Sequence, residues 1–301
     1  MPNVYKIVTQ KIIERIESAI KNGEKLTWLK GWNGYAPRNY ITQRPYRGIN
    51  LWLLPDGGEY ITWAQLCDIH KKNPEIKLKK GCKKHLIVYW NIVEKIEEVD
   101  GEEVKKMVPL LRYYYVYHIS DVEGLESKIQ KFEHNPIEEA EKVIRNYCIR
   151  TNLDFQEVEG SDKAYYSPRE HKVRVPSKNQ FKHLEEYYST VFHELGHASG
   201  KILGRFTEDD VVSMFNRESY SREELVAEFT AAMVCSSLGI ETKETVENNQ
   251  AYLQGWLSAI KNADSTFLVR AAAAAQKASD LILNVKYQDQ KQEQYEEATV
   301  A

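Results

Sequence analysis

The spacing of hydrophobic and polar residues divides this 301-residue chain into predicted helices and strands. Apolar residues recur at every third or fourth position in segments 4–21, 63–72, 136–148, 249–261 and 266–283, which predicts amphipathic helices there. The first helix is expected to end at Asn22-Gly23, because glycine readily takes the left-handed conformation that closes a helix. Strand patterns occupy 85–90, 110–119, 164–168 and 172–176, with an acidic hairpin or insertion around Asp100-Gly101 between the first two.

The order of these elements predicts an α+β protein of two domains, since 301 residues exceed the usual size of a single core. We expect an N-terminal α/β domain in residues 1–130, a mainly helical domain with a small β-sheet in 136–285, and a flexible tail in 286–301. Charge also separates the halves. Residues 1–93 hold 16 Lys and Arg against 7 Asp and Glu, whereas the remainder holds 25 against 37. This asymmetry predicts that the first domain meets a polyanion.

The sequence shows no membrane-spanning segment, no secretion signal and no paired-cysteine motif. No apolar run reaches membrane-spanning length, and the N-terminus lacks the charged-then-apolar pattern of a secretion signal. The four cysteines are widely scattered, which fits free thiols in a reducing compartment. We therefore expect a cytoplasmic protein with no membrane contact.

The strongest chemical signal is the His-Glu-x-x-His pattern formed by His193, Glu194 and His197. Residues four apart on a helix share a face, so both imidazoles can bind one metal ion. Glu194, one residue on, can act as general base toward a water molecule, which is the arrangement of zinc hydrolases. Zn²⁺ is the default ion for such ligands, and Mn²⁺ or another divalent cation could replace it.

A catalytic metal of this kind needs a third protein ligand, and segment 222–233 offers one. Glu224 and Glu228 lie one turn apart on a helical face that adjoins an apolar stripe. We assign Glu224 as the third ligand and Glu228 as the acceptor of a ligand imidazole's second N–H. The reverse assignment stays open, because the sequence does not define the rotation of the helix. In an isolated helix, both acids would be ordinary solvated side chains.

The strands at 164–168 and 172–176 are joined by a short turn. Such a hairpin is either plain scaffold or the edge strand on which an extended peptide is laid.

Basic and aromatic residues are interleaved in the first half of the chain, including Trp28, Lys30, Trp32 and Tyr35. This combination is typical of proteins that bind single-stranded DNA, because cations follow the phosphates while flat rings stack on any base. No helix-turn-helix or zinc-finger pattern indicates duplex recognition. Some aromatic residues lie in apolar runs and are expected in the core, namely Trp52, Trp63 and Trp90. The candidate DNA contacts are Arg38, Tyr40, Arg44, Tyr46, Arg47, Lys79, Lys80, Lys83 and Lys84.

Several ordered blocks together resemble the ArdC-like antirestriction family over nearly the whole chain. These blocks are Pro37-Arg38-Asn39-Tyr40, Arg44-Pro45-Tyr46-Arg47-Gly48-Ile49-Asn50, Leu111-Arg112-Tyr113-Tyr114-Tyr115-Val116-Tyr117, Ala164-Tyr165-Tyr166-Ser167-Pro168, the His193 motif and Glu223-Glu224-Leu225-Val226-Ala227-Glu228. The resemblance implies an N-terminal single-stranded-DNA-binding domain joined to a C-terminal zincin-type metallopeptidase domain. It further implies a protein of conjugative plasmids and related mobile elements that protects incoming DNA against host restriction.

Three functions compete at this point. A catalytic protease would cut an unknown protein substrate. A non-catalytic single-stranded-DNA-binding protein of plasmid transfer or replication would keep the zincin domain as a scaffold. A zinc hydrolase unrelated to DNA would need the basic, aromatic half to be ordinary core. Glu194 favours hydrolysis, because a scaffold needs no general base.

Overall fold

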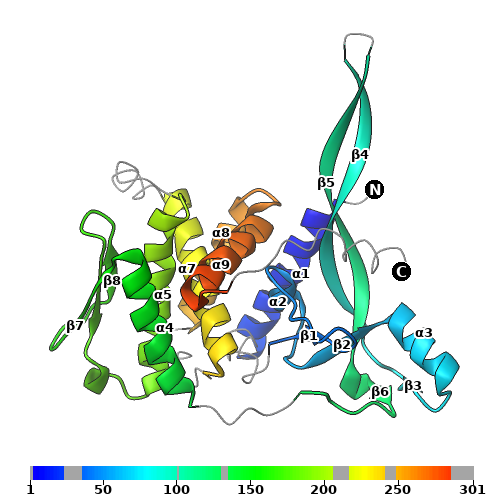
Figure 1. The fold of residues 1–301 in the computed structure, drawn as a ribbon, viewed down its shortest axis with the longest axis horizontal. Helices are drawn as coiled ribbons and strands as arrows, with labels where there is room; N and C mark the ends of the chain where they lie inside the picture. Colours follow the sequence, from blue (N-terminus) through cyan, green and yellow to red (C-terminus); the bar gives the residue numbers. More distant parts are fainter. Residues whose placement is uncertain are drawn as a thin grey trace.

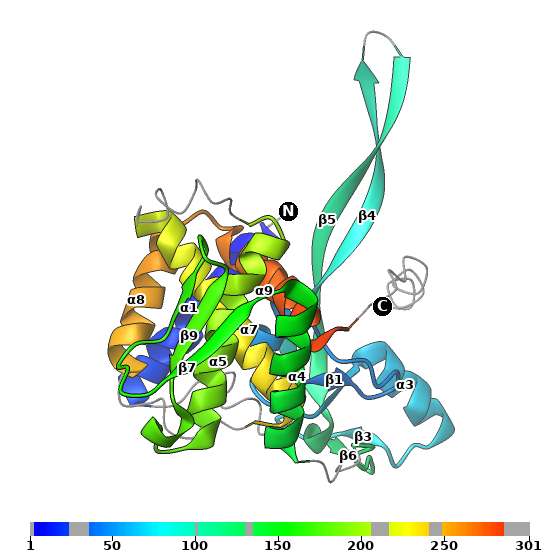
Figure 2. The same ribbon diagram turned by 60° about the vertical axis from the view of Figure 1, so that its left-hand side comes forward.

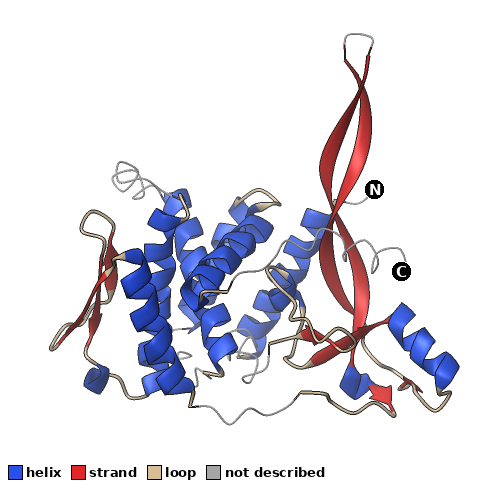
Figure 3. Cartoon of the chain, in the orientation of Figure 1, coloured by secondary structure: helices blue, strands red, loops and turns tan. Residues whose placement is uncertain are grey.

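The computed structural model of the chain describes residues 3–23, 36–99, 102–129, 135–205, 217–240 and 249–285. The predicted tail, the tip of the acidic hairpin, and Trp28, Lys30, Trp32 and Tyr35 lie outside these residues. Helices fill the middle of the molecule, with a small sheet on one side and a long two-stranded ribbon on the other (Figures 1 and 3). The predicted α+β class is confirmed.

The N-terminal part begins with helix α1 (Val4–Asn22), which the Asn3 side chain caps at its start. Gly23, with φ of 64°, ends it as predicted. A four-stranded sheet follows in the order β1-β2-β5-β4, built from β1 (Arg38–Asn39), β2 (Glu59–Thr62), β4 (His85–Val99) and β5 (Glu102–His118). Helix α2 (Asn50–Leu53) lies beside β4, and helix α3 (Trp63–Lys72) starts directly after β2. The short strands β3 (Lys77–Leu78) and β6 (Val122–Glu123) pair separately.

The predicted strands at 85–90 and 110–119 are the lower parts of one long hairpin. Strands β4 and β5 pair without interruption from His85 opposite Val116 to Val99 opposite Glu102. On β5, only the last residues, from Val116 to His118, pair with β2. Because no other described strand pairs with the distal part, the ribbon projects away from the body (Figure 1).

The C-terminal part places helices against a three-stranded sheet. Strand β9 (Lys172–Pro176) lies between β7 (Asp154–Val158) and β8 (Tyr165–Ser167), so β8 is an edge strand. The helices are α4 (Pro136–Thr151), α5 (Leu184–Ile202), α7 (Arg217–Leu238), α8 (Asn249–Asn262) and α9 (Phe267–Leu283). In the turned view, β7 and β9 pass in front of α5 (Figure 2). No helix in the described part of the chain combines the length and apolarity needed to cross a membrane.

One hydrophobic core joins the two halves of the sequence. The buried face of α1, including Val8 and Ile12, packs in the same cluster as residues of α7, α8 and α9. Trp52 of α2 lies fully buried against Phe229 of α7, with ring centroids 4.0 Å apart. The N-terminal helix therefore packs as part of the same helical layer as α7, α8 and α9 from the second half of the chain.

Two aromatic residues occupy positions that differ from the prediction. Trp52 is buried as expected, but Trp63 is 57% exposed and Trp90 is 43% exposed, so their assignment to the core is wrong. Trp63 is the first residue of α3, and Trp90 lies on β4, the edge strand of its sheet. At both places the chain runs along the surface, although the neighbouring sequence is apolar.

Candidate metal centre and nucleic-acid surface

Helix α5 brings the two predicted histidine ligands together. Their Nε2 atoms lie 3.1 Å apart, because His193 and His197 are separated by one helical turn. Both side chains are mostly buried, with 18% and 16% of their surface exposed. The buried face of α5, including Val191 and Leu195, holds this turn of helix in the core.

Helix α7 supplies the acid. The Glu224 carboxylate lies 3.5 Å from Nε2 of His193 and 3.5 Å from Nε2 of His197. Together, one donor atom from each of these three residues lies within 4.8 Å of the others. A side chain at Gly196 would meet the α7 backbone, since its Cβ would lie 3.0 Å from Cα of Ala227. Glycine and alanine therefore permit the close helix contact that brings Glu224 to the histidines.

Each imidazole has a second carboxylate on its outer nitrogen. Glu228 lies 3.3 Å from Nδ1 of His193, and Glu223 lies 3.6 Å from Nδ1 of His197. Carboxylates in this position orient metal-binding imidazoles and make them more basic. The rotation of α7, open in the sequence, thus directs Glu224 toward the Nε2 atoms and Glu228 toward Nδ1.

Sequence reasoning gave no role to Glu223 or to Arg205. The Arg205 guanidinium donates to both oxygens of Glu223, at 2.7 and 3.2 Å. It also donates to the carbonyl of Gly196 at 2.7 Å and to the Ser199 hydroxyl at 3.0 Å. The adjacent acids at 223 and 224 were the only sequence signal for this contact. Arg205 lies on a different segment from α7, so no local pattern links it to Glu223.

Glu194 lies beside the histidines on α5 and is only 7% exposed. Burial raises the pKa of its carboxyl, an effect that the nearby His193 and His197 partly oppose. The carboxylate also accepts a hydrogen bond from the backbone of Tyr166 in β8. The proposed general base thus lies between the histidine pair and an edge strand.

The electrostatics of the centre suit a cation. Burial would lower the pKa of His193, but hydrogen bonds to Glu224 and Glu228 raise it well above its ordinary value. Burial by itself would raise the pKa of Glu223, but its contacts with His197 and Arg205 outweigh burial and lower that pKa. Two imidazoles and a carboxylate converging in an acidic setting are a donor set that fits a divalent metal ion.

Two predicted DNA contacts have structural partners instead. The Tyr40 side chain is 7% exposed and packs in a cluster with Ile61 and Leu66, which differs from the exposed position that stacking requires. Arg47 forms an ion pair with Asp280 of α9. Tyr46 is half-buried, and its ring packs nearly perpendicular to that of Tyr60, with ring centroids 6.3 Å apart.

The remaining predicted contacts are more accessible. Arg38 is half-buried in β1, and Arg44 is exposed in the turn that follows. Lys79, Lys80, Lys83 and Lys84 are all exposed along the turn that leads into β4, although Lys79 also donates to the carbonyl of Ser120 at 2.7 Å.

Exposed aromatic rings accompany the lysine turn at places that sequence reasoning did not select. Tyr113 and Tyr115 of β5 are 38% and 37% exposed, with ring centroids 6.0 Å apart. The Lys84 ammonium lies 4.2 Å from the centre of the Tyr115 ring. The Trp63 ring lies beside Tyr117, the next tyrosine on this face of β5, with ring centroids 6.3 Å apart. We call Trp63, Tyr113, Tyr115 and Tyr117 the aromatic row. The alternation of tyrosines along β5 was its sequence signal.

Comparisons with known proteins agree with this geometry. Residues 138–274, which contain the whole metal centre, match the family model of a zincin-like metallopeptidase. This is the class of domain that the two packed helices and their donor atoms define. Residues 2–117 match the N-terminal domain of the anti-restriction factor ArdC. The chain belongs to the ArdC-like antirestriction family.

Two crystal structures of one relative cover nearly the whole chain. The chain is similar to the antirestriction ArdC protein from plasmid R388 in its metal-free crystal structure, with 28% identity, a TM-score of 0.68, and coverage of 93% of this chain and 96% of that chain. The Mn(II)-bound structure of that protein gives 26% identity and the same TM-score, covering 95% and 100%.

Curated relatives differ in length. DNA primase TraC of Escherichia coli is 28% identical over 93% of this chain, which spans only 20% of the primase. An uncharacterised protein of Sinorhizobium fredii is 26% identical, with 92% of this chain and 91% of that protein covered.

Proposed function

We propose that this chain is an antirestriction protein of a mobile element. It binds single-stranded DNA and carries a metal-dependent peptidase-type site, and it protects incoming DNA in the cytoplasm of the recipient cell during conjugation. The observation that carries the enzymatic part is the convergence of His193, His197 and Glu224 beside the buried Glu194. Similarity to the antirestriction ArdC protein of plasmid R388 supports the biological role.

His193, His197 and Glu224 would hold the metal ion, with Glu228 and Glu223 orienting the two imidazoles. Zn²⁺ suits this ligand set, and Mn²⁺ is an alternative because the R388 relative has been solved with Mn(II). A divalent cation there supplies Lewis-acid activation of a carbonyl group and of water. The Glu194 carboxylate takes the proton of the attacking water and passes it to the leaving amine. Strand β8 lies at the edge of its sheet and would align an extended segment of the protein substrate.

Single-stranded DNA would follow the lysine turn and the aromatic row. Ammonium groups of Lys80, Lys83 and Lys84 would neutralise phosphates, while the exposed rings of Tyr115 and Trp63 would stack on bases. Side chains on one face of a strand repeat roughly every 7 Å, a spacing that lets successive rings meet different bases. This assignment replaces Tyr40 and Arg47, whose side chains are buried or ion-paired.

The competing proposal is a non-catalytic DNA-binding protein that uses the zincin domain as a scaffold. A buried, unneeded carboxylate at position 194 would only cost stability, which favours catalysis. Glu194→Gln separates the two, because it keeps the side-chain volume and removes the proton acceptor. The variant should retain metal and DNA binding and lose peptide hydrolysis.

The decisive assay is rescue of DNA transferred by conjugation into a restricting host. We expect Glu194→Gln to lose protection, and the triple variant Lys80→Ala, Lys83→Ala, Lys84→Ala to lose it through weaker DNA binding. Protection by Glu194→Gln equal to that of the unmodified chain, together with loss in the lysine variant, would establish the scaffold function and exclude the enzymatic one.

A further inference from the structure

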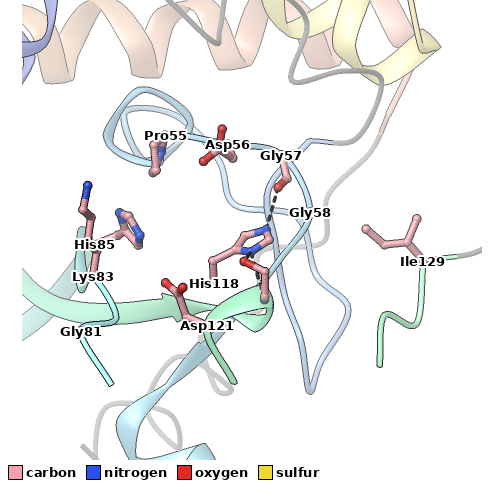
Figure 4. Close-up of a pocket in the computed structure, with 11 residues that line it drawn as sticks. Pro55, Asp56, Gly57, Gly58, Gly81, Lys83, His85, His118, Asp121 and Ile129 are labelled. Atoms are coloured by element: carbon pink, nitrogen blue, oxygen red, sulfur yellow. Dashed lines mark hydrogen bonds between the residues drawn. The ribbon is translucent and has the colours of Figure 1, made fainter. Parts of the chain in front are cut away.

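A cavity of about 720 Å³ lies at the end of the sheet opposite the projecting ribbon. The loop Pro55-Asp56-Gly57-Gly58 forms one wall, and the start of β4 with Lys83 and His85 forms another (Figure 4). The end of β5 contributes His118, and Asp121 follows in the short 3-10 helix Ile119–Asp121. The pocket therefore adjoins the lysine turn but belongs to neither the metal centre nor the aromatic row.

Its walls are held in place before any ligand arrives. His118 Nε2–H donates to the carbonyl of Gly57 at 3.1 Å, and His118 Nδ1 accepts from the Ser120 backbone N–H at 3.2 Å. These two contacts require the neutral ring with its proton on Nε2, since a carbonyl only accepts and an N–H only donates. The Tyr60 ring packs at nearly right angles against His118 and His85, with centroids 4.9 and 5.7 Å apart.

Polar groups inside the pocket are left without protein partners. Within the described residues, the side chains of Asp56, Lys83, His85 and Asp121 make no hydrogen bond or ion pair. Burial lowers the pKa of His85, which keeps its ring neutral and able to donate from one nitrogen and accept at the other. The pocket lining thus presents unused acceptors together with one cation, Lys83, while the charge of Arg15 also acts on Asp56 and His85.

The kind of ligand follows from this balance. Asp56 and Asp121 balance the charges of Lys83 and of Arg15, which interacts with Asp56, so the pocket has no excess of positive charge to hold an anion. The pocket residues do not form a metal-ligand group among the described side chains. Carboxylates accept well from the exocyclic amino group of a base, as in acidic contacts to cytosine N4. Thymine has only one ring N–H, and its two flanking carbonyl oxygens would be repelled by Asp56 and Asp121. Gly81 leaves the backbone open to a flat ring, because nothing lies within 4 Å of its Cβ position, whereas the His118 ring fills that space at Gly58.

We propose that this pocket receives one base of the bound single strand and selects a base with an amino group over thymine. The inference rests on the proposed binding of single-stranded DNA and adds a base-dependent contribution to it. The adjoining Lys83 and Lys84 would hold the phosphates on either side of the inserted base.

The test compares an oligothymidylate with a strand of equal length in which cytosines are interspersed, using the full chain at constant salt. The unmodified protein should bind the cytosine-containing strand about fivefold or more tightly, the lower limit for one good base contact. The double variant Asp56→Ala, Asp121→Ala should bind both strands equally. Loss of negative charge raises affinity for both strands alike, so the affinity ratio is the readout.

Asp68→Ala is the matched control, because it removes an exposed carboxylate from α3, outside the pocket. It should keep the preference for cytosine. Equal affinity of the unmodified protein for both strands, or an unchanged preference in the double variant, overturns the pocket assignment while leaving single-strand binding intact. Absence of binding to either strand would contradict the proposed DNA-binding function itself.

Discussion

Four carboxylates surround the two histidines of the metal centre, and their distances separate their roles. Glu224 approaches the Nε2 atoms, Glu228 and Glu223 approach the Nδ1 atoms, and Glu194 lies on the same helix as the histidines. Uncompensated, so many acids in a mostly buried site would repel one another. A bound divalent cation would relieve this repulsion, and Arg205 already does so for Glu223.

Removal of single ligands should distinguish these roles. His193→Ala, His197→Ala and Glu224→Ala should each abolish stoichiometric metal binding, because three protein donors are needed. Glu228→Ala should weaken it only about 10–100-fold, as expected for a residue that orients a ligand. Metal content after dialysis and a competitive chelator titration measure both effects. The opposite ranking of Glu224 and Glu228 would exchange their assignments.

Arg205 should influence the metal without touching it. Arg205→Ala leaves the Glu223 carboxylate buried without its guanidinium partner, so the orientation of His197 is lost. We expect metal affinity to fall about 10–100-fold. Arg222→Ala, an exposed arginine at the start of the same acidic segment, should leave the affinity unchanged. Equal affinities for the two variants would show that Arg205 has no positioning role.

At the scale of elements, the close packing of α5 and α7 determines whether the third ligand reaches the histidines. The contact depends on Gly196, whose absent side chain makes room for the Ala227 backbone and for Thr230. Strand β8 also helps to position the site, because its backbone donates a hydrogen bond to Glu194. Its outer edge pairs with no other described strand. The site is thus assembled from two helices and one strand.

Gly196→Ala should therefore damage both stability and metal binding. A Cβ 3.0 Å from backbone forces the helices apart, an overpacking change that costs about 1–3 kcal/mol. Gly255→Ala in α8 is the control, because nothing lies within 4 Å of its Cβ position. That variant should be neutral or slightly more stable, since alanine is the better helix former. Thermal unfolding and chelator titration compare the two; similar behaviour would contradict the close-contact argument.

At the scale of the whole molecule, the shared core couples the DNA-binding half to the metal-binding half. Helix α1 and Trp52 pack against α7, α8 and α9, although they precede them by more than half the chain. A fragment of the first 130 residues would therefore expose Val8, Ile12 and Trp52 to water. We expect the full chain to unfold as one cooperative unit rather than as two independent domains.

Two tryptophans should separate stability from binding. Trp52→Ala removes a fully buried ring and should lower the free energy of unfolding by about 3–5 kcal/mol, with loss of structure in both halves. Trp63→Ala, at a 57% exposed position, should change stability by no more than about 0.5 kcal/mol. It should nevertheless weaken single-strand binding by roughly 1–3 kcal/mol, the contribution of one stacked base. Denaturant titration and fluorescence anisotropy measure both; unchanged DNA affinity would remove Trp63 from the aromatic row.

Local patterns in the sequence were sufficient for most helices and strands and for the histidine pair. Helical periodicity and Gly23 defined α1, and the four-residue spacing alone placed His193 and His197 on one face. These features depend on residues a few positions apart, so backbone geometry determines them before any tertiary contact forms.

Contacts between distant segments were decided only by the tertiary structure. Three contacts are of this kind: Glu224 of α7 with the histidines of α5, Arg205 with Glu223, and Trp52 with Phe229. Each joins residues from separate segments, and their positions in the sequence do not show that they lie close together. Exposure of Trp63 and burial of Tyr40 belong to the same category. Apolar or basic neighbours describe a residue's local sequence, whereas burial depends on which element later packs over it.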